Sequence, residues 1–303
     1  MSTLAIDIGG TKIAVGLVDD EGELVHRARR PTPDGDAETV WAAVEALIGE
    51  ALTAAGGRVR GVGIGCGGPI DLSAGTVSPI NIIEWKRFPI VDRVASVVDA
   101  PVRLHGDGLC MALGERWVGA GRGARFMLGM VVSTGVGGGL VLDGAPYGGR
   151  TGNAGHVGHV VVDSDGAPCS CGGRGCVETI AAGPRMAQWA RTQGWDAPVD
   201  ADAKELADAA NAGDAVALRA YRRGATAVAA MIASVAAVCD LDLVVIGGGV
   251  AKSGALLFDP VREALASYAG LEFLHGLRVL PAALGSEAGL IGAAALVVTG
   301  EQT

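Results

Sequence analysis

Long hydrophobic runs, positive charge and aromatic residues are all scarce in this chain of 303 residues. It contains no run of about 18 uninterrupted apolar residues, so we expect no membrane-spanning helix. The N-terminus has no basic stretch and reaches Asp7 at once. We therefore expect no secretory signal peptide, and a location in the cytoplasm.

Basic residues are outnumbered, with 24 Lys and Arg against 33 Asp and Glu, which gives a net charge of −9. The basic residues also form no long run. Because an acidic chain repels a phosphate backbone, we expect no nucleic-acid partner. Any phosphate-binding site must instead be built locally.

Apolar residues make up 50% of the chain, and glycine is abundant at 49 residues. The mean hydropathy of +0.38 indicates a sizeable core and excludes a disordered chain. The glycines cluster in short groups between apolar runs, which favours tight turns and close approach of the backbone to a ligand.

Short apolar runs alternate with glycine turns and helical patterns, which predicts an α/β protein of two domains. We place the smaller domain at residues 1–118, and expect a closing helix near 286–303 to pack back on it. Its strands are expected at 4–7, 13–18, 23–28, 61–65 and 102–105, and its helices at 39–55 and 109–118.

The larger domain is expected at residues 119–285 and begins with the same pattern of strand, glycine turn and strand as the smaller domain. A strand at 127–132 leads into a glycine turn at 133–139 and a return strand at 140–142. A long apolar helix at 214–237 and a buried strand at 243–246 follow. The recurrence indicates a duplicated fold rather than a sequence repeat.

The first strand delivers an acid to a turn rich in backbone amides. Asp7 is followed by Gly9, Gly10, Thr11 and Lys12. Outward-facing N–H groups in such a turn bind anions, and Thr and Lys add a hydroxyl and a cation. The alternative is an ordinary hairpin with glycine turn chemistry.

Two further strand ends carry glycine-rich turns that are candidate phosphate or nucleotide cradles. Neither fits the Lys–Ser/Thr phosphate loop or the dinucleotide fingerprint. The candidate residues are Thr134, Gly135, Gly137 and Gly138 in one turn, and Gly247, Gly248 and Gly249 in the other.

Asp107 follows an apolar strand and is flanked by glycines. A carboxylate at a strand tip lies where ligand crevices form in α/β folds, and it can accept a proton from a hydroxyl nucleophile. The alternative is that Asp107 serves as the N-cap of the next helix.

One imidazole and three thiols lie at spacings typical of a zinc site: His159, Cys169, Cys171 and Cys176. Such a set suits tetrahedral Zn²⁺, and protein groups filling all the positions would make the site structural. The alternative is a group of free or redox-active thiols. Glu178 lies two residues beyond Cys176 and would share its rigidity.

Together these motifs resemble the ROK family, the repressor–kinase family among the actin-like, hexokinase-like ATPases, over nearly the whole chain. The resemblance implies a two-domain fold of duplicated ribonuclease H-like domains with the active site in the cleft between them. The first phosphate motif begins at Asp7, which leaves no room for a repressor's winged helix, so the chain resembles the kinase branch.

The resemblance also implies the reaction and its participants. A kinase of this family uses ATP and Mg²⁺, carries a structural Zn²⁺ and is commonly a homodimer or homotetramer. Asp107 maps onto the catalytic base. The sugar-binding positions map onto Gly68, Asn81, Gly106, Asp107, His156, His159 and Glu178.

Two of those positions depart from the family pattern, because Gly106 replaces the usual Asn and His156 the usual Glu. A site without these partners loses affinity for the sugar that needed them. We therefore expect phosphorylation of the 6-hydroxyl of a modified sugar of the 3-amino-3-deoxyglucose type. The alternatives are a plain glucokinase, a C7-cyclitol kinase, an N-acylhexosamine kinase and a non-catalytic sugar sensor.

Overall fold

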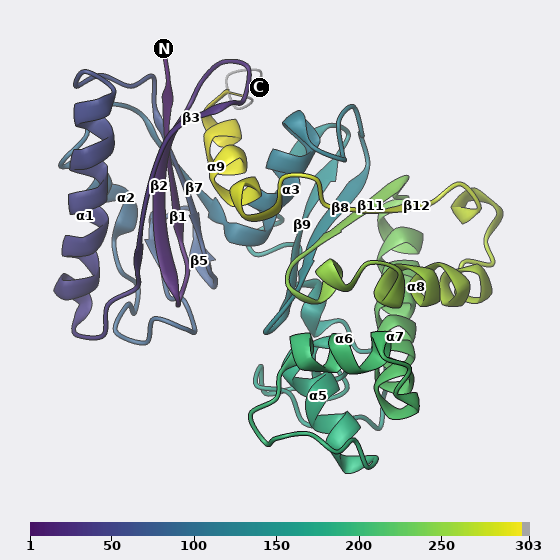
Figure 1. The fold of residues 1–303 in the computed structure, drawn as a ribbon. Coiled ribbons are helices and arrows are strands. Elements are labelled where there is room, and N and C mark those ends of the chain that lie inside the picture. Colours follow the sequence, from purple (N-terminus) through teal and green to yellow (C-terminus); the bar gives the residue numbers. More distant parts are fainter. Residues whose placement is uncertain (299–303) are drawn as a thin grey trace. The chain divides into compact units, whose positions relative to one another are not determined.

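The computed structural model describes residues 1–298, which fold into two compact units (Figure 1). The first unit holds residues 1–123, 139–155 and the chain from residue 283 onward; the second holds 124–138 and 156–282. Both units are therefore discontinuous, whereas we expected a single break near residue 118 and a returning helix. That helix begins at Ala288, and residues 299–303 of its expected range lie outside the described residues.

Five strands form the sheet of the first unit, in the order β3-β2-β1-β4-β7. β2 pairs antiparallel with both β1 and β3, while β4 pairs parallel with both β1 and β7. The strands are β1 (Thr3–Ile8), β2 (Lys12–Val18), β3 (Leu24–Pro31), β4 (Val62–Cys66) and β7 (Val102–Gly106), with a small separate hairpin of β5 (Ile70–Asp71) and β6 (Thr76–Val77).

The second sheet has the order β10-β9-β8-β11-β12 and repeats this scheme. β10 pairs antiparallel with β9, and β11 pairs parallel with β8 and β12. The shared strand order confirms the duplicated fold that the recurring strand–turn–strand pattern predicted. Its strands are β8 (Met127–Val132), β9 (Val136–Leu142), β10 (Ala145–Tyr147), β11 (Leu243–Gly247) and β12 (Arg278–Pro281).

Helices cover both faces of the first sheet, with α1 on one face and α9 on the other (Figure 1). α1 buries one stripe at helical spacing, formed by Val40, Trp41, Val44, Leu47, Ile48 and Ala51. On the other face, a Cβ on Gly63 would lie 1.8 Å from the carbonyl oxygen of Ala293, so glycine in β4 is what lets α9 approach. The helices are α1 (Ala37–Ala54), α2 (Ile90–Ala95), α3 (Asp107–Val118) and α9 (Ala288–Val298), which follows the 3-10 turn η4 (Gly285–Glu287).

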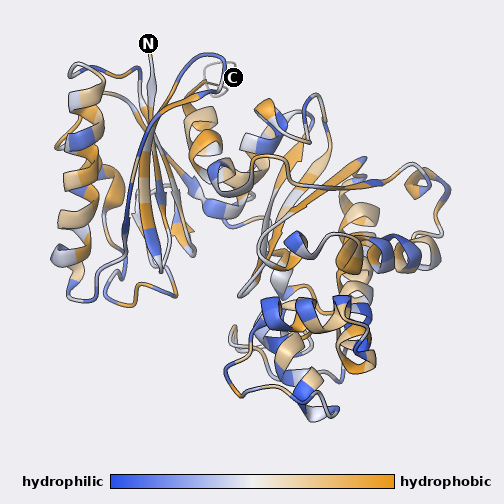
Figure 2. Ribbon diagram, viewed as in Figure 1, coloured by the Kyte–Doolittle hydropathy of each residue, from blue (hydrophilic) through white to orange (hydrophobic). Residues whose placement is uncertain are grey.

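The second unit is built around α7 (Ala215–Cys239), which packs against α4, α5, α6 and α8. Within residues 1–298, α7 alone is long and apolar enough to cross a membrane by length and composition, but half of its most apolar stretch is buried in the protein. The core helix of a folded unit meets the same criteria, and Figure 2 shows apolar residues along most of α7. The other elements are α4 (Glu178–Ala181), α5 (Gly183–Thr192), α6 (Ala203–Asn211) and α8 (Ala255–Tyr268), with 3-10 turns η1 (Val157–His159), η2 (Val250–Ser253) and η3 (Glu272–Leu274).

Candidate active site

The turn between β1 and β2 is a tight hairpin of the first unit. The N–H of Gly9 donates to the carbonyl of Lys12 (3.0 Å), and the hydroxyl of Thr32 donates to the carbonyl of Gly9 (2.6 Å). A Cβ on Gly10 would lie 2.6 Å from the side chain of Asn81, so glycine lets Asn81 lie directly over the turn. The backbone is thus the hairpin that the sequence allowed, and its phosphate binding stays a prediction.

Asp7 lies near the end of β1, just before this turn. Burial raises the pKa of its carboxyl from 3.8 to about 6; Lys12 lowers the pKa, and the negative charge of Asp107 raises it. The first helical turn of α9 lies close by, because a Cβ on Gly289 would be 3.2 Å from the Asp7 carboxyl. A nearby cation would favour the ionised form of this carboxyl.

Asp107 is the first residue of α3, and Gly106 occupies the N-cap position, so the alternative reading of Asp107 as the cap is wrong. The reason is the extended backbone of Gly106, after which Asp107 already adopts helical geometry. Asp107 is exposed, and its Oδ1 accepts the N–H of Gly108 (2.7 Å). A Cβ on Gly67 would lie 4.0 Å from Oδ2 of Asp107 and 3.6 Å from Oδ1 of Asn81. Gly67, Asn81 and Asp107 therefore border the same space.

His105 precedes this pair at the tip of β7 and is buried. Its Nδ1 accepts the N–H of Gly106 (2.9 Å), and burial lowers its pKa from 6.5 to about 4. The ring is therefore neutral near pH 7, and it fixes the backbone immediately before Asp107.

The segment that carries Gly68 and Asn81 is anchored by an aromatic pair. Trp85 is buried and stacks on Phe88 with ring centroids 4.2 Å apart, and its Nε1 donates to the carbonyl of Ala37 (3.2 Å). Trp85 is thus a core residue of this segment, whereas Asn81 faces the space next to Asp107.

The other two glycine turns adjoin each other in the second unit. The N–H of Ser133 donates to the carbonyl of Gly135 (2.9 Å), which closes the turn between β8 and β9. A Cβ on Gly248 would lie 2.4 Å from the carbonyl oxygen of Val132, and one on Gly249 would lie 3.3 Å from the hydroxyl of Ser133. Thr134–Gly138 and Gly247–Gly249 are therefore brought together, and their binding of a nucleotide stays a prediction.

Glu178 begins α4 and contacts the first of these turns. Its Oε2 accepts the N–H of Val136 (2.9 Å), and a Cβ on Gly135 would lie 2.7 Å from the same oxygen. The sequence predicted a sugar-binding acid at this position but contained no signal for its bond to the turn.

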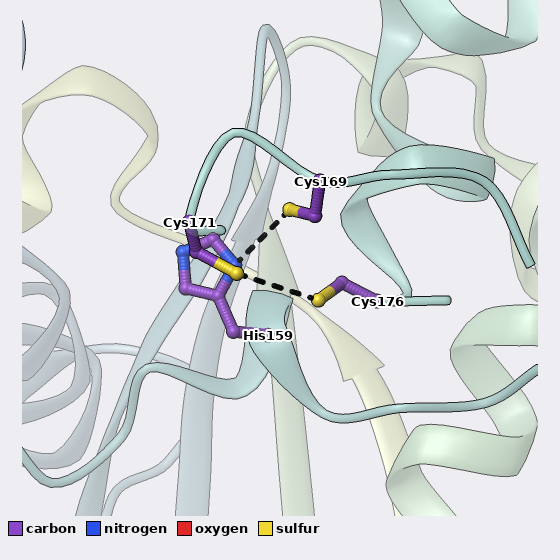
Figure 3. A group of neighbouring side chains, drawn as sticks. All are labelled: His159, Cys169, Cys171 and Cys176. Carbon is purple, nitrogen blue, oxygen red and sulfur yellow. Dashed lines mark hydrogen bonds between the residues drawn. The ribbon is translucent and has the colours of Figure 1, made fainter. Parts of the chain in front are cut away.

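The predicted ligands of Zn²⁺ form one cluster in the second unit (Figure 3), and their ligand atoms all lie within 4.8 Å of one another. Sγ of Cys169 lies 3.6 Å from Nδ1 of His159, and Sγ of Cys171 lies 3.7 Å from Sγ of Cys176. Tetrahedral zinc with bonds of about 2.3 Å places its sulfur ligands about 3.8 Å apart. The cluster therefore fits Zn²⁺.

The thiols of this cluster differ in acidity. Burial raises the pKa of Cys169, but hydrogen bonds from the backbone and thiol of Cys171, the thiol of Cys176 and the ring of His159 together outweigh burial and lower it to about 7. A thiol of lowered pKa readily supplies the thiolate that zinc binds.

His156 lies at the start of η1 and is exposed. Its ring stacks on that of His159, with the ring centroids 6.3 Å apart.

Two contacts between distant segments were missed by the sequence analysis. The side-chain amide of Asn153 accepts the N–H of Ile70 (3.0 Å) and donates to its carbonyl (2.8 Å). The buried carboxylate of Glu115 accepts N–H groups from Ala283 (3.0 Å) and Leu284 (2.8 Å). No local pattern marks either residue, because the partners lie far away along the chain.

Comparison with known proteins identifies the family. The ROK family matches residues 3–299. A glucokinase of Thermotoga maritima is 34% identical, over 98% of this chain and 97% of the relative. An N-acetylmannosamine kinase of Yersinia pestis is 37% identical, over 96% of each chain.

A solved structure agrees with these relatives. The ROK family glucokinase of Streptomyces griseus, in complex with glucose and AMPPNP, superposes with a TM-score of 0.83 at 35% identity, over 98% of this chain and 99% of that one. The fold is thus the predicted actin-like, hexokinase-like ATPase fold. On its sequence, its strand order and these matches, the chain belongs to the ROK family.

Proposed function

We propose that this member of the ROK family, an ATP-dependent sugar kinase, phosphorylates the primary (6-) hydroxyl of a hexose-like ring that differs from glucose, such as an amino sugar of the 3-amino-3-deoxyglucose type. The observation that carries the proposal is the exposed carboxylate of Asp107, which shares one space with Gly67 and Asn81.

Asp107 is the general base in this proposal. The N–H of Gly108 holds Oδ1, while Oδ2 lies on the side of Gly67 and Asn81. Oδ2 is therefore the atom that accepts the proton as the acceptor hydroxyl attacks the γ-phosphoryl group of ATP. Gly68 and Asn81 line the acceptor on the same side.

Each glycine turn would bind phosphate oxygens through backbone amides other than those of Gly9 and Val136, which already donate to Lys12 and Glu178. The amides that we assign to phosphate are those of Gly10 and Thr11 in the first turn and of Thr134, Gly135, Gly137 and Gly138 in the second. Lys12 and Asp7 flank the first turn. Asp7 would hold Mg²⁺ through water, and the bound ion would neutralise phosphate charge. The raised pKa of the partly buried Asp7 carboxyl supports this assignment, since a nearby cation would favour its ionised form.

A cavity of about 650 Å³ in the second unit supports a place for the adenosine. It is lined by residues of α7 and α8, by Asn211 at the end of α6 and by Ser253, the last residue of η2. Because η2 begins directly after Gly249, the nucleotide would extend from the Gly247–Gly249 turn into this cavity.

Zn²⁺ would be held by His159, Cys169, Cys171 and Cys176, and would stiffen the segments that carry the acceptor-binding groups. His159 presents Nδ1 to Cys169, so Nε2 is the ring atom that we assign to the sugar. Glu178 follows the cluster and supplies the second acid.

The acceptor assignment rests on Gly106 and His156. A Cβ on Gly106 would meet nothing within 4 Å, so a side chain is absent where the acceptor could carry extra bulk or a different polar group. His156 is exposed and can donate as well as accept a hydrogen bond. Both changes favour an acceptor with an altered ring substituent.

A second candidate is an N-acylhexosamine such as N-acetylmannosamine. The observation in its favour is the N-acetylmannosamine kinase that is 37% identical to this chain, against 34% for the Thermotoga glucokinase. Identities this similar do not separate the acceptors, so they must be compared directly.

The test is release of ADP from Mg-ATP, measured with glucose, 3-amino-3-deoxyglucose, glucosamine, N-acetylglucosamine, N-acetylmannosamine, fructose and a C7 cyclitol. We expect a modified sugar to exceed glucose in kcat/KM by about a hundredfold, which corresponds to roughly 2.7 kcal/mol. Glucose as the best acceptor would reject the modified-sugar proposal, and no ADP release with any acceptor would favour a sugar sensor.

Location and assembly stay predictions. We expect the enzyme to act in the cytoplasm, where ATP is supplied, and as a homodimer or homotetramer. Analytical ultracentrifugation of the purified protein measures the oligomeric state directly.

A further inference from the structure

The peptide group of Val136, at the end of the second phosphate turn, is held on both sides by segments of the zinc motif. Its N–H donates to Oε2 of Glu178 (2.9 Å). Its carbonyl oxygen would lie 1.9 Å from a Cβ on Gly158, so the 3-10 turn that ends at His159 presses directly against it. Glycine at 158 is what permits this approach.

The start of the same turn is held in a similar way. The N–H of Gly183, which begins α5 directly after α4, donates to the carbonyl of Ser133 (2.8 Å). Together with the bonds at Val136, this fixes the turn at both ends. The segments that fix it lie on either side of the cysteine–histidine cluster in the sequence.

The position of Glu178 is itself set by the backbone of the cluster. The N–H of Val177 donates to the carbonyl of Val160 (2.9 Å), and both the N–H and the hydroxyl of Thr179 donate to the carbonyl of Cys176 (2.9 and 2.7 Å). Val161 and Cys176 form a β-bridge. The carboxylate that reaches Val136 is therefore placed by residues adjoining the zinc ligands.

We propose that Glu178 is a positioning residue for the second phosphate turn, and that the zinc motif shapes this turn for the nucleotide before any acceptor binds. This inference rests on the proposed role of the turn in phosphate binding. Oε2 of Glu178 accepts the N–H of Val136 (2.9 Å), so the carboxylate already contacts the turn when no acceptor is bound.

The test is the affinity for Mg-ADP without acceptor, measured by calorimetry on zinc-loaded protein. We expect Glu178→Ala to weaken binding about tenfold, because it removes a charge-assisted bond to a backbone N–H. Glu178→Gln keeps an oxygen that accepts this N–H, so it should bind within about threefold of wild type. Glu272→Ala, which removes an exposed charge of the same unit, should leave the affinity unchanged.

Mg-ADP affinity in Glu178→Ala equal to wild type, with equal zinc content and melting temperature, would overturn the inference. A sugar contact alone predicts that outcome, since no sugar is present. If no acceptor is phosphorylated but Glu178→Ala still binds Mg-ADP about tenfold more weakly, the proposed kinase function is rejected while the positioning role of Glu178 is supported.

A second measurement needs no variant. In the ligand-free, zinc-loaded protein, we expect the amide of Val136 to exchange its hydrogen at least about a hundredfold more slowly than an unfolded chain does. Removal of zinc should accelerate this exchange while the amides of β1 in the other unit stay protected. Unprotected exchange at Val136 in the zinc-loaded protein would overturn the inference.

Discussion

Asn81 lies over Gly10 so closely that a Cβ on residue 10 would be 2.6 Å from its side chain. The turn predicted to bind phosphate and the residue predicted to contact the acceptor therefore pack against each other, although they are far apart in the sequence. Asn81 also faces the space next to Asp107. A substitution at Gly10 should therefore change how Asn81 contacts the acceptor.

Gly10→Ala tests that relationship. The new methyl group must push Asn81 aside, so we expect kcat/KM for the acceptor to fall by about a hundredfold, as misplacement by about 1 Å does in other active sites. The matched control is Gly49→Ala in α1, where a Cβ meets nothing within 4 Å. Steady-state kinetics on both variants decides the question, and equal activities would contradict the packing argument.

Asp107→Asn tests the catalytic base. The amide keeps the shape of the side chain but cannot take the proton, so kcat should fall by about a thousandfold or more while Mg-ATP still binds. Kinetics and calorimetry on the same sample separate the two effects. Wild-type turnover in the folded variant would reject the assignment.

Asp7→Asn should lower the activity and raise the stability of the ligand-free protein. Burial raises the pKa of Asp7 from 3.8 to about 6, so the native protein holds this proton more tightly than the unfolded chain. Its contribution to stability is complete below about pH 3.8 and is lost as the pH rises through about 6. In ligand-free, metal-free protein near pH 7.5, we expect Asp7→Asn to be more stable by roughly 3 kcal/mol.

Denaturant unfolding of both proteins across this range measures that effect. The gap between Asp7→Asn and wild type should narrow as the pH falls toward about 4, where both side chains are neutral. A gap that stays constant with pH would show that ionisation of Asp7 is not its cause.

Zinc removal should lower stability. With about one zinc per chain expected, chelation should reduce the melting temperature by at least about 5 °C, because the loops around the cluster lose their cross-link. His159→Asn should reproduce the loss, while His275→Asn, an exposed histidine of the same unit, should not. An unchanged melting curve after verified metal removal would argue against a structural site.

Restoring the usual family residues should shift the acceptor preference. A Cβ on Gly106 meets nothing within 4 Å, so Gly106→Asn should fold normally, as should a change at the exposed His156. We expect the double variant Gly106→Asn, His156→Glu to gain on glucose and lose on the preferred acceptor, each by at least about tenfold in kcat/KM. An unaltered ratio of kcat/KM for glucose to kcat/KM for the preferred acceptor would show that other residues determine the specificity.

Local pattern predicted much of the fold, because short strands, turns and helices are encoded by neighbouring residues. The strand ending near Asp7, the α1 stripe and the strand–turn–strand recurrence all lie where expected. The reading of Asp107 as an N-cap was wrong because Gly106 takes that position. The return of residues 139–155 to the first unit was not predicted, because a chain that crosses between units leaves no mark in the composition.

By itself, the sequence determined the duplicated α/β fold, the family and the cysteine–histidine set, since all of these are carried by spacing along the chain. Only the tertiary structure decided that Asn81 covers Gly10, that Glu178 holds Val136 and that Asp7 is partly buried near the charge of Asp107. The physical reason is that these contacts and the pKa of Asp7 depend on how distant segments pack, and packing removes water from groups that the sequence shows only as polar.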